Sequence, residues 1–140
     1  MTQTIKVKRA YGKPVSGEII VFREGFSPRY DLDRTTGMIS KRGHSAEGQS
    51  IKDKILVIPT AKGGVAAGWA FFDLLHRGLA PRALVFGKLN PVMVQGAVFA
   101  KLPITEGWSP NALELLHTGD FVSIDPDQRL LKRVSEAVTG

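Results

Sequence analysis

The sequence of 140 residues contains no cysteine. Without thiolates, the chain cannot build a disulfide scaffold, use a cysteine nucleophile, bind zinc through cysteine or hold an iron–sulfur cluster by itself. Long apolar runs are also missing, because the longest, residues 55–59 and 65–75, fall short of the ~20 residues that cross a bilayer. Residues 1–8 lack the apolar core of a signal peptide, so we expect a cytoplasmic protein with no membrane partner.

Negative charge is scarce in this chain. Lys and Arg number 19 against 13 Asp and Glu, which gives a formal net charge of +6. This balance favours an anionic partner such as nucleic acid, an acidic protein surface or a carboxylate substrate. The basic residues are scattered, and no basic helix or RNA-binding aromatic strand is present, so we expect no nucleic acid partner. The length and the absence of repeats predict a single domain over residues 1–140.

Strand patterns flank a helical middle section. Residues 54–59 and 82–86 are continuous apolar runs, which are typical of strands covered on both faces. The alternation of strands and helices, with further strands at both ends, predicts an α/β fold in the form of a β/β/α sandwich. The expected strands cover residues 4–9, 18–22, 54–59, 82–86, 121–125 and 130–134, with a short one starting at 102–104; the expected helices cover residues 65–77, 92–101 and 109–117.

The expected helix at residues 65–77 is apolar nearly all round. We expect Trp69, Phe71 and Phe72 to lie mostly in the core. In so small a domain, an apolar surface on several sides also favours coverage by a second chain. The helix that ends at His117 is expected to begin with a cap at Ser109 before Pro110.

Residues 23–50 are expected to form one long structureless loop with a turn at Thr36-Gly37. Loops of this length in a compact domain are usually functional or disordered. His44 lies on this loop and is a candidate catalytic or substrate-contacting residue, whereas the charged stretch around Arg29, taken in isolation, favours a solvated surface loop. The three histidines show no metal-ligand spacing, and we expect no metal site in this chain.

The turn at residues 59–64 joins a buried strand to a helix. Its glycines let the backbone approach a ligand, and the free N–H groups at a helix start favour an anion. Lys62 adds a positive charge to the same turn. The turn therefore predicts a carboxylate or phosphate pocket, with an ordinary strand–helix connection as the alternative. It matches neither the Walker loop nor the GxGxxG fingerprint.

An ordered series of motifs resembles the small subunit, or swivelling domain, of the aconitase X family over nearly the whole chain. The series comprises residues 19–22, Asp-Arg-Thr-Thr-Gly at 33–37, His-Ser-Ala-Glu-Gly at 44–48, Ile-Leu-Val-Ile-Pro at 55–59, the turn at 60–64, and residues 80–85, 90–97 and 118–125. The resemblance implies a swivelling β/β/α fold like the mobile domain of aconitases. It also implies a larger subunit, in a heterodimer or higher assembly, that holds an iron–sulfur cluster.

The family's activities are dehydrations of hydroxy acids, namely cis-3-hydroxy-L-proline and, in archaea, mevalonate 5-phosphate. By resemblance, this chain is the small subunit of a hydro-lyase for a small hydroxy carboxylic acid and is inactive alone. The resemblance assigns the substrate carboxylate to Lys62, Gly63 and Gly64, with His44 and Arg29 contributing from the long loop.

The chain departs from the family at its serine-rich turn, where one serine is the presumed base. Gly64, Val65 and Ala66 occupy those positions and cannot carry a proton, and the nearest hydroxyl, Thr60, aligns before the glycine. The catalytic residue is therefore unknown. The base comes from the larger subunit, the turn retains only a binding role, or the chain supports another cluster-dependent reaction such as an isomerisation. A stand-alone ligand-binding domain is a further alternative.

Overall fold

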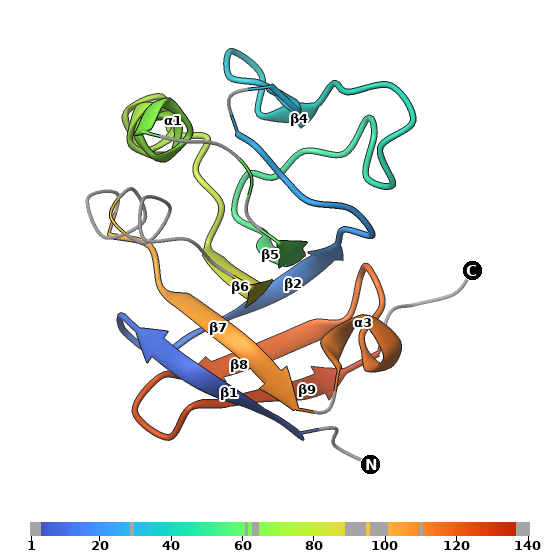
Figure 1. The fold of residues 1–140 in the computed structure, drawn as a ribbon, viewed down its shortest axis with the longest axis vertical. Coiled ribbons are helices and arrows are strands. Elements are labelled where there is room, and N and C mark those ends of the chain that lie inside the picture. Colours follow the sequence, from blue (N-terminus) through green and yellow to red (C-terminus); the bar gives the residue numbers. More distant parts are fainter. Residues whose placement is uncertain are drawn as a thin grey trace.

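The computed structural model shows three layers (Figure 1). A layer made of one helix and a long connection lies over the parallel strands, and further strands lie on the other side of these. The structure describes residues 4–28, 30–60, 62, 65–88, 95, 101–109 and 111–136, without the side chains of residues 65–68. The helix expected at residues 92–101 lies almost entirely outside the described residues.

Seven strands close into a barrel in the order β1, β7, β6, β5, β2, β8, β9. β2, β5, β6 and β7 run parallel to one another, whereas β1, β8 and β9 pair antiparallel with their neighbours. The carboxyl ends of the four parallel strands therefore meet at one edge. The strands are β1 (Thr4–Tyr11), β2 (Val15–Val21), β5 (Ile55–Thr60), β6 (Ala83–Lys88), β7 (Ile104–Ser109), β8 (Phe121–Asp125) and β9 (Leu130–Ser135).

The two central strands, β5 and β6, are buried on both faces, as their continuous apolar sequences predict. Because side chains alternate along a strand, each strand serves two cores. Leu56, Ile58 and Phe86 belong to the core under the helix. Val57 and Val85 belong to the core inside the barrel.

Helix α1 (Val65–His76) packs over β5 and β6 through Phe71 and Leu74, which have no exposed surface. The prediction for Trp69 is wrong: this side chain is 52% exposed. Its ring stands edge-on to half-buried Phe72, 5.8 Å between centroids, on the side of the helix away from the core. No helix among the described residues is long and apolar enough to cross a bilayer.

The connection from β2 to β5 is more ordered than the predicted structureless loop. It contains a two-stranded hairpin of β3 (Leu32–Asp33) and β4 (Met38–Ile39), turned at Gly37, whose φ of 77° confirms the predicted turn. Buried apolar side chains, among them Phe26, anchor the connection to the core. The buried carboxylate of Asp31 accepts the Ser27 N–H at 2.9 Å, so the connection also carries its own polar anchors.

The expected cap at Ser109 is also wrong, because Ser109 is the last residue of β7. Helix α3 (Ala112–Leu115) starts instead after Asn111, whose side chain accepts the Leu113 N–H at 2.9 Å. Asparagine is as good an N-cap as serine. The sequence therefore predicted a helix start in this segment correctly but assigned the cap to the wrong residue. Pro110 lies outside the described residues.

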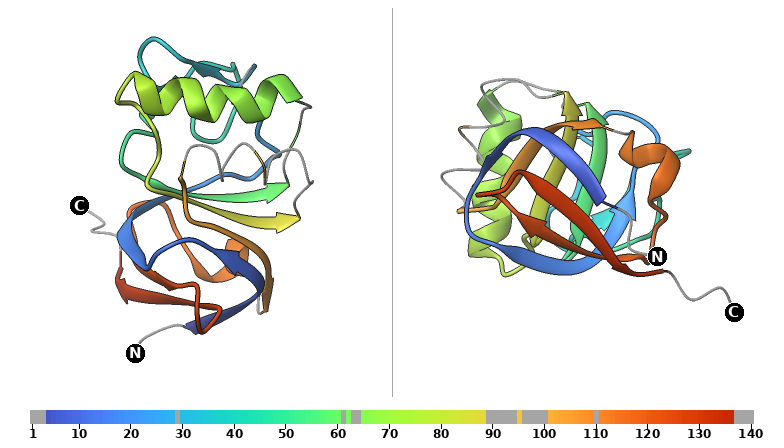
Figure 2. Two further views of the ribbon diagram at one scale, coloured as in Figure 1. Left: turned by 90° about the vertical axis from the view of Figure 1, so that its left-hand side faces the viewer. Right: turned by 90° about the horizontal axis from the view of Figure 1, so that it is seen from below.

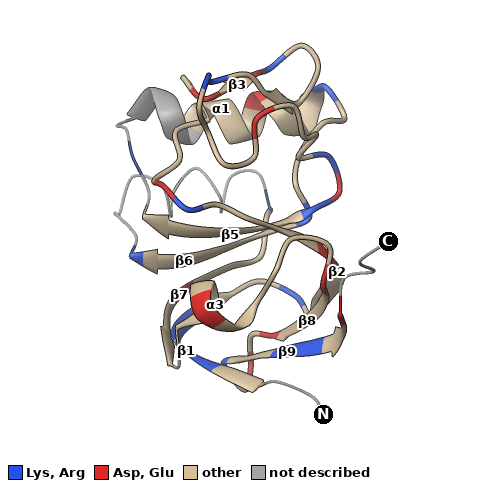
Figure 3. Cartoon of the chain, turned by 90° about the vertical axis from the view of Figure 1, so that its right-hand side faces the viewer, with Lys and Arg blue, Asp and Glu red and all other residues tan. Residues whose placement is uncertain are grey.

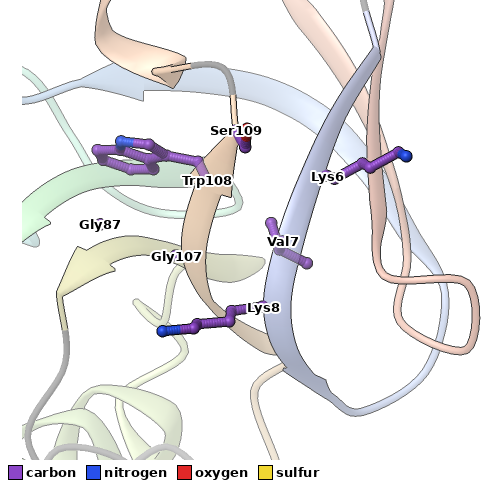
Figure 4. A pocket seen from close by; sticks show the side chains of 7 residues that line it. All are labelled: Lys6, Val7, Lys8, Gly87, Gly107, Trp108 and Ser109. Atoms are coloured by element: carbon purple, nitrogen blue, oxygen red, sulfur yellow. The ribbon is translucent and has the colours of Figure 1, made fainter.

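Gly87 admits the Trp108 ring to the end of the barrel, where both line one hollow with Lys8 (Figure 4). A Cβ at Gly87 would lie 2.6 Å from Trp108 Cζ2 and 2.8 Å from the carbonyl oxygen of Pro59. We predict that Gly87→Ala lowers the free energy of unfolding by about 1–3 kcal/mol, the usual cost of overpacking. Chemical denaturation would measure the change.

Gly17→Ala is the matched control, because it is also a strand glycine. Its Cβ would meet the flexible Arg82 side chain at 3.0 Å rather than backbone. A loss of stability no larger in Gly87→Ala than in Gly17→Ala would contradict the packing argument.

Candidate functional site

Gly25 forms a floor beneath the turn that follows β5. A Cβ at Gly25 would lie 2.7 Å from Lys62 Cε and 3.0 Å from both Lys62 Cγ and Thr60 Cγ2, so both side chains converge over this glycine. The backbone fixes this arrangement on both sides of Phe26. The Phe26 N–H donates to Thr60 O at 3.2 Å, and the Lys62 N–H donates to Phe26 O at 3.1 Å.

Lys88 lies beside Thr60 at the end of the neighbouring strand. The β5–β6 register pairs Thr60 with Lys88, and paired residues of neighbouring strands share one face of a sheet. Thr60, Lys62 and Lys88 are all exposed. We call these three residues and Gly25 the strand-end platform. The tips of β5 and β6 that carry it point to the same side of the molecule (Figure 3).

Helix α1 runs back across the sheet, so its N-terminal end lies over the tips of β5 and β6 (Figure 2). The N-terminus of a helix carries a partial positive charge. The helix therefore adds to the positive potential of the two platform lysines. Together these groups can attract an anion to the carboxyl edge of the parallel strands.

A hydrogen-bonded network holds the segment before Gly25. Glu24 accepts from the Ser45 backbone N–H at 3.2 Å and from the Ser45 hydroxyl. The Arg23 N–H in turn donates to Ser45 Oγ at 3.0 Å. Through Ser45, the long connection thereby holds Arg23 and Glu24 in place and fixes the position of Gly25 in the platform.

His44 lies behind Glu24, and its side chain has no exposed surface. Its Nδ1 accepts the Ala46 N–H at 3.0 Å, so the proton of the neutral ring is on Nε2. Nε2 lies 3.3 Å from Glu24 Oε1 but is not aligned for a hydrogen bond and has no other partner among the described residues. The ring packs edge-on against Phe22 at 4.9 Å. His44 therefore supports Glu24 and has no surface that a substrate could touch.

The environment of Glu24 keeps it ionised. Burial alone would raise its pKa, but the hydrogen bonds from Ser45, with a smaller contribution from His44, lower the pKa below the ordinary 4.5. A carboxylate with a lowered pKa and with acceptor positions already in use serves as a structural anchor. Sequence reasoning missed Glu24 and noted Ser45 only as part of the motif at 44–48.

The structure places two of the predicted site residues, Lys62 and His44, and keeps them apart. Lys62 is exposed on the platform, whereas the side chain of His44 is enclosed beside Glu24 and Phe22. Arg29, Gly63 and Gly64 lie outside the described residues. Within the described part of the chain, no group of three His, Cys, Asp or Glu residues could hold a metal ion.

The fold and this edge define a class: a β-barrel domain whose parallel strands present a cationic turn below a helix. The family model of the aconitase X swivel domain matches residues 4–133, and the chain belongs to that family. The crystal structure of aconitase X from Thermococcus kodakaraensis in its holo-form superimposes with a TM-score of 0.87 at 28% identity, covering 95% of this chain and 99% of that one. This match confirms the predicted swivelling β/β/α fold.

Two curated relatives are similar over most of their length. The phosphomevalonate dehydratase small subunit of Methanocella arvoryzae is 28% identical over 121 residues, which is 86% of this chain and 92% of the relative. The protein of the same name from Thermococcus kodakarensis is 30% identical over 123 residues, covering 88% and 90% of the two chains.

The lowered pKa of Glu24 predicts a pH-dependent contribution to stability. A carboxylate whose folded pKa lies below its unfolded value stabilises the fold above the unfolded pKa, about 4.5, and loses this contribution as the pH falls through the folded pKa. We expect Glu24→Gln to lower the denaturation midpoint at pH 7 more than at pH 3.

Ser45→Ala removes the hydroxyl that lowers the pKa of Glu24, so we expect it to reduce the same pH dependence. The comparison requires denaturation curves of the three proteins at each pH. An equal difference between wild type and Glu24→Gln at both pH values would refute this account of Glu24.

Proposed function

We propose that this chain is the small subunit of an aconitase-X-type hydro-lyase that dehydrates a small hydroxy carboxylic acid. One observation carries the proposal: Lys62 lies exposed over Gly25 at the strand ends, in a chain of this family. The names of the two relatives, both dehydratase small subunits, support the reaction class. The family match over residues 4–133 supports a single swivelling domain over residues 1–140.

In this proposal the turn after β5 binds the substrate carboxylate. The Lys62 ammonium donates to it, and the backbone N–H groups of Gly63 and Gly64 add neutral donors before the positive end of α1. Arg29 contributes from the long connection. His44 contributes through Glu24, because its side chain is enclosed.

The iron–sulfur cluster is proposed to belong to a larger partner subunit. This chain has no cysteine, and its described residues contain no metal-binding group, so they do not fit a cluster. The role of this chain is to bind the acid and to orient it toward the partner.

The proton acceptor is proposed to come from the larger subunit. Removal of a proton next to a carboxylate requires a base within hydrogen-bond reach of that proton. Gly64, Val65 and Ala66 stand at the family's serine positions and have no titratable side chain. The same observation supports a second candidate function, in which the subunit lacks dehydratase activity and serves substrate binding or another reaction such as an isomerisation.

The main test is co-expression with an aconitase-X-type larger subunit, followed by an assay for iron-dependent dehydration of hydroxy acids. We expect Lys62→Met to lower kcat/KM about tenfold or more, since hydrogen bonds to charged groups contribute about 1.5–3 kcal/mol. Lys52→Met, at an exposed lysine on the connection before β5, is the matched control. An intact, cluster-loaded complex that dehydrates none of the acids would exclude the proposed reaction.

A second experiment separates the two candidate functions by restoring serine at Gly64, Val65 and Ala66. If the partner supplies the base, the wild-type complex is active and the triple variant changes its rate little. A wild-type complex without dehydratase activity that gains it in the triple variant would instead favour the second function.

A further inference from the structure

We infer that the strand-end platform binds a doubly charged anionic group or a pair of carboxylates, with Thr60 and Lys88 contacting the ligand in addition to Lys62. The inference deepens the proposed function and rests on it only in placing the substrate's carboxylate at Lys62. The ligand class is a dianion, either a phosphate group or a short dicarboxylate.

Thr60, the last residue of β5, and Lys62 are two residues apart in the sequence. The close approach of both to the position of the missing Cβ of Gly25 confirms that they converge. Thr60 approaches Gly25 through its methyl carbon Cγ2, and the hydroxyl on the same side chain can donate or accept a hydrogen bond. In the inferred complex, this hydroxyl forms a hydrogen bond with the ligand that Lys62 binds.

Lys88 brings a second positive charge to the same face. The register pairs it with Thr60, and neighbouring strands lie about 4.8 Å apart, which is the scale of a phosphate or of a short dicarboxylate. Like charges on adjacent strand positions repel each other, so an arrangement of two lysines around one hydroxyl gains stability when an anion neutralises it.

Two other lysines have acidic partners. Lys54 pairs with Glu18, and Lys41 lies 3.7 Å from Asp31. Within the described part of the chain, neither Lys62 nor Lys88 is in an ion pair. Glu24, the carboxylate next to Gly25, is directed to Ser45 and His44 instead. The ammonium groups of Lys62 and Lys88 therefore remain available to an anionic ligand. Two positive charges match a dianion better than a single carboxylate.

The test is a titration of the purified full chain with malonate, inorganic phosphate and acetate at constant ionic strength, followed by amide chemical shifts in NMR spectra. We expect malonate or phosphate to saturate the shifts of Gly25, Thr60, Lys62 and Lys88 at concentrations at least tenfold below acetate. Saturation by phosphate alone assigns a phosphate group, and saturation by malonate alone assigns a dicarboxylate. Equal affinity for dianions and acetate, or shifts that never saturate, would overturn the inference.

Variants then assign the residues. We expect Lys88→Met to weaken dianion binding at least fivefold and acetate binding much less, Lys88→Arg to restore it, and Thr60→Val to weaken binding of both. Lys52→Met should leave all affinities unchanged, and the thermal midpoint of each variant shows whether it is folded. Unchanged dianion affinity in folded Lys88→Met would overturn the role of Lys88. Because the titration needs no partner subunit, a failed dehydration assay and a failed inference remain distinguishable.

Discussion

The parallel pairing of β5 between β2 and β6 is the constraint on which the rest of the structure depends. Ile55 to Ile58 are buried on both faces, so this strand can lie only in the middle of the molecule, with α1 on one side and the barrel interior on the other. Parallel neighbours must return through long connections, and these are α1 and the segment between β2 and β5. The carboxyl ends of the strands consequently meet at one edge, which is where binding sites of open α/β sheets also form.

Two missing side chains shape this edge from opposite faces. On the face toward α1, Gly25 leaves room for Thr60 and Lys62 to converge. On the barrel face, Gly87 leaves room for Trp108 against the Pro59 carbonyl. One edge can therefore be tightly closed toward the barrel and open toward a ligand, because the alternation of side chains separates the two tasks. The Glu24–Ser45 network adds stiffness where the first glycine could otherwise move.

The sequence was most informative where hydrophobic pattern alone decides the structure. Local sequence patterns predict strands β5 and β6, which are buried on both faces, and helix α1. They also predict the cationic turn at Lys62. Trp69 was predicted wrongly because helical periodicity does not say which side of an apolar helix lacks a neighbour. Glu24 was missed because its partners lie about twenty residues away, across a connection whose hairpin is too short to leave a pattern. The pairing of Thr60 with Lys88 likewise depends on register, which a single sequence does not reveal.

In the proposed function, the turn after β5 separates anion binding from proton transfer. Backbone N–H groups and a lysine ammonium can bind an anion whether or not serines are present, so loss of the serines leaves this task intact. Proton abstraction is different, because it needs a basic atom at one place. Thr60 bears the only hydroxyl on the platform, and a neutral threonine hydroxyl is a hydrogen-bond donor or acceptor rather than a base. Glu24 is occupied by Ser45 and has a lowered pKa, which makes it a weak base. Among the described residues the edge therefore offers binding groups without a competent base, which is the physical reason for assigning proton transfer to the partner subunit.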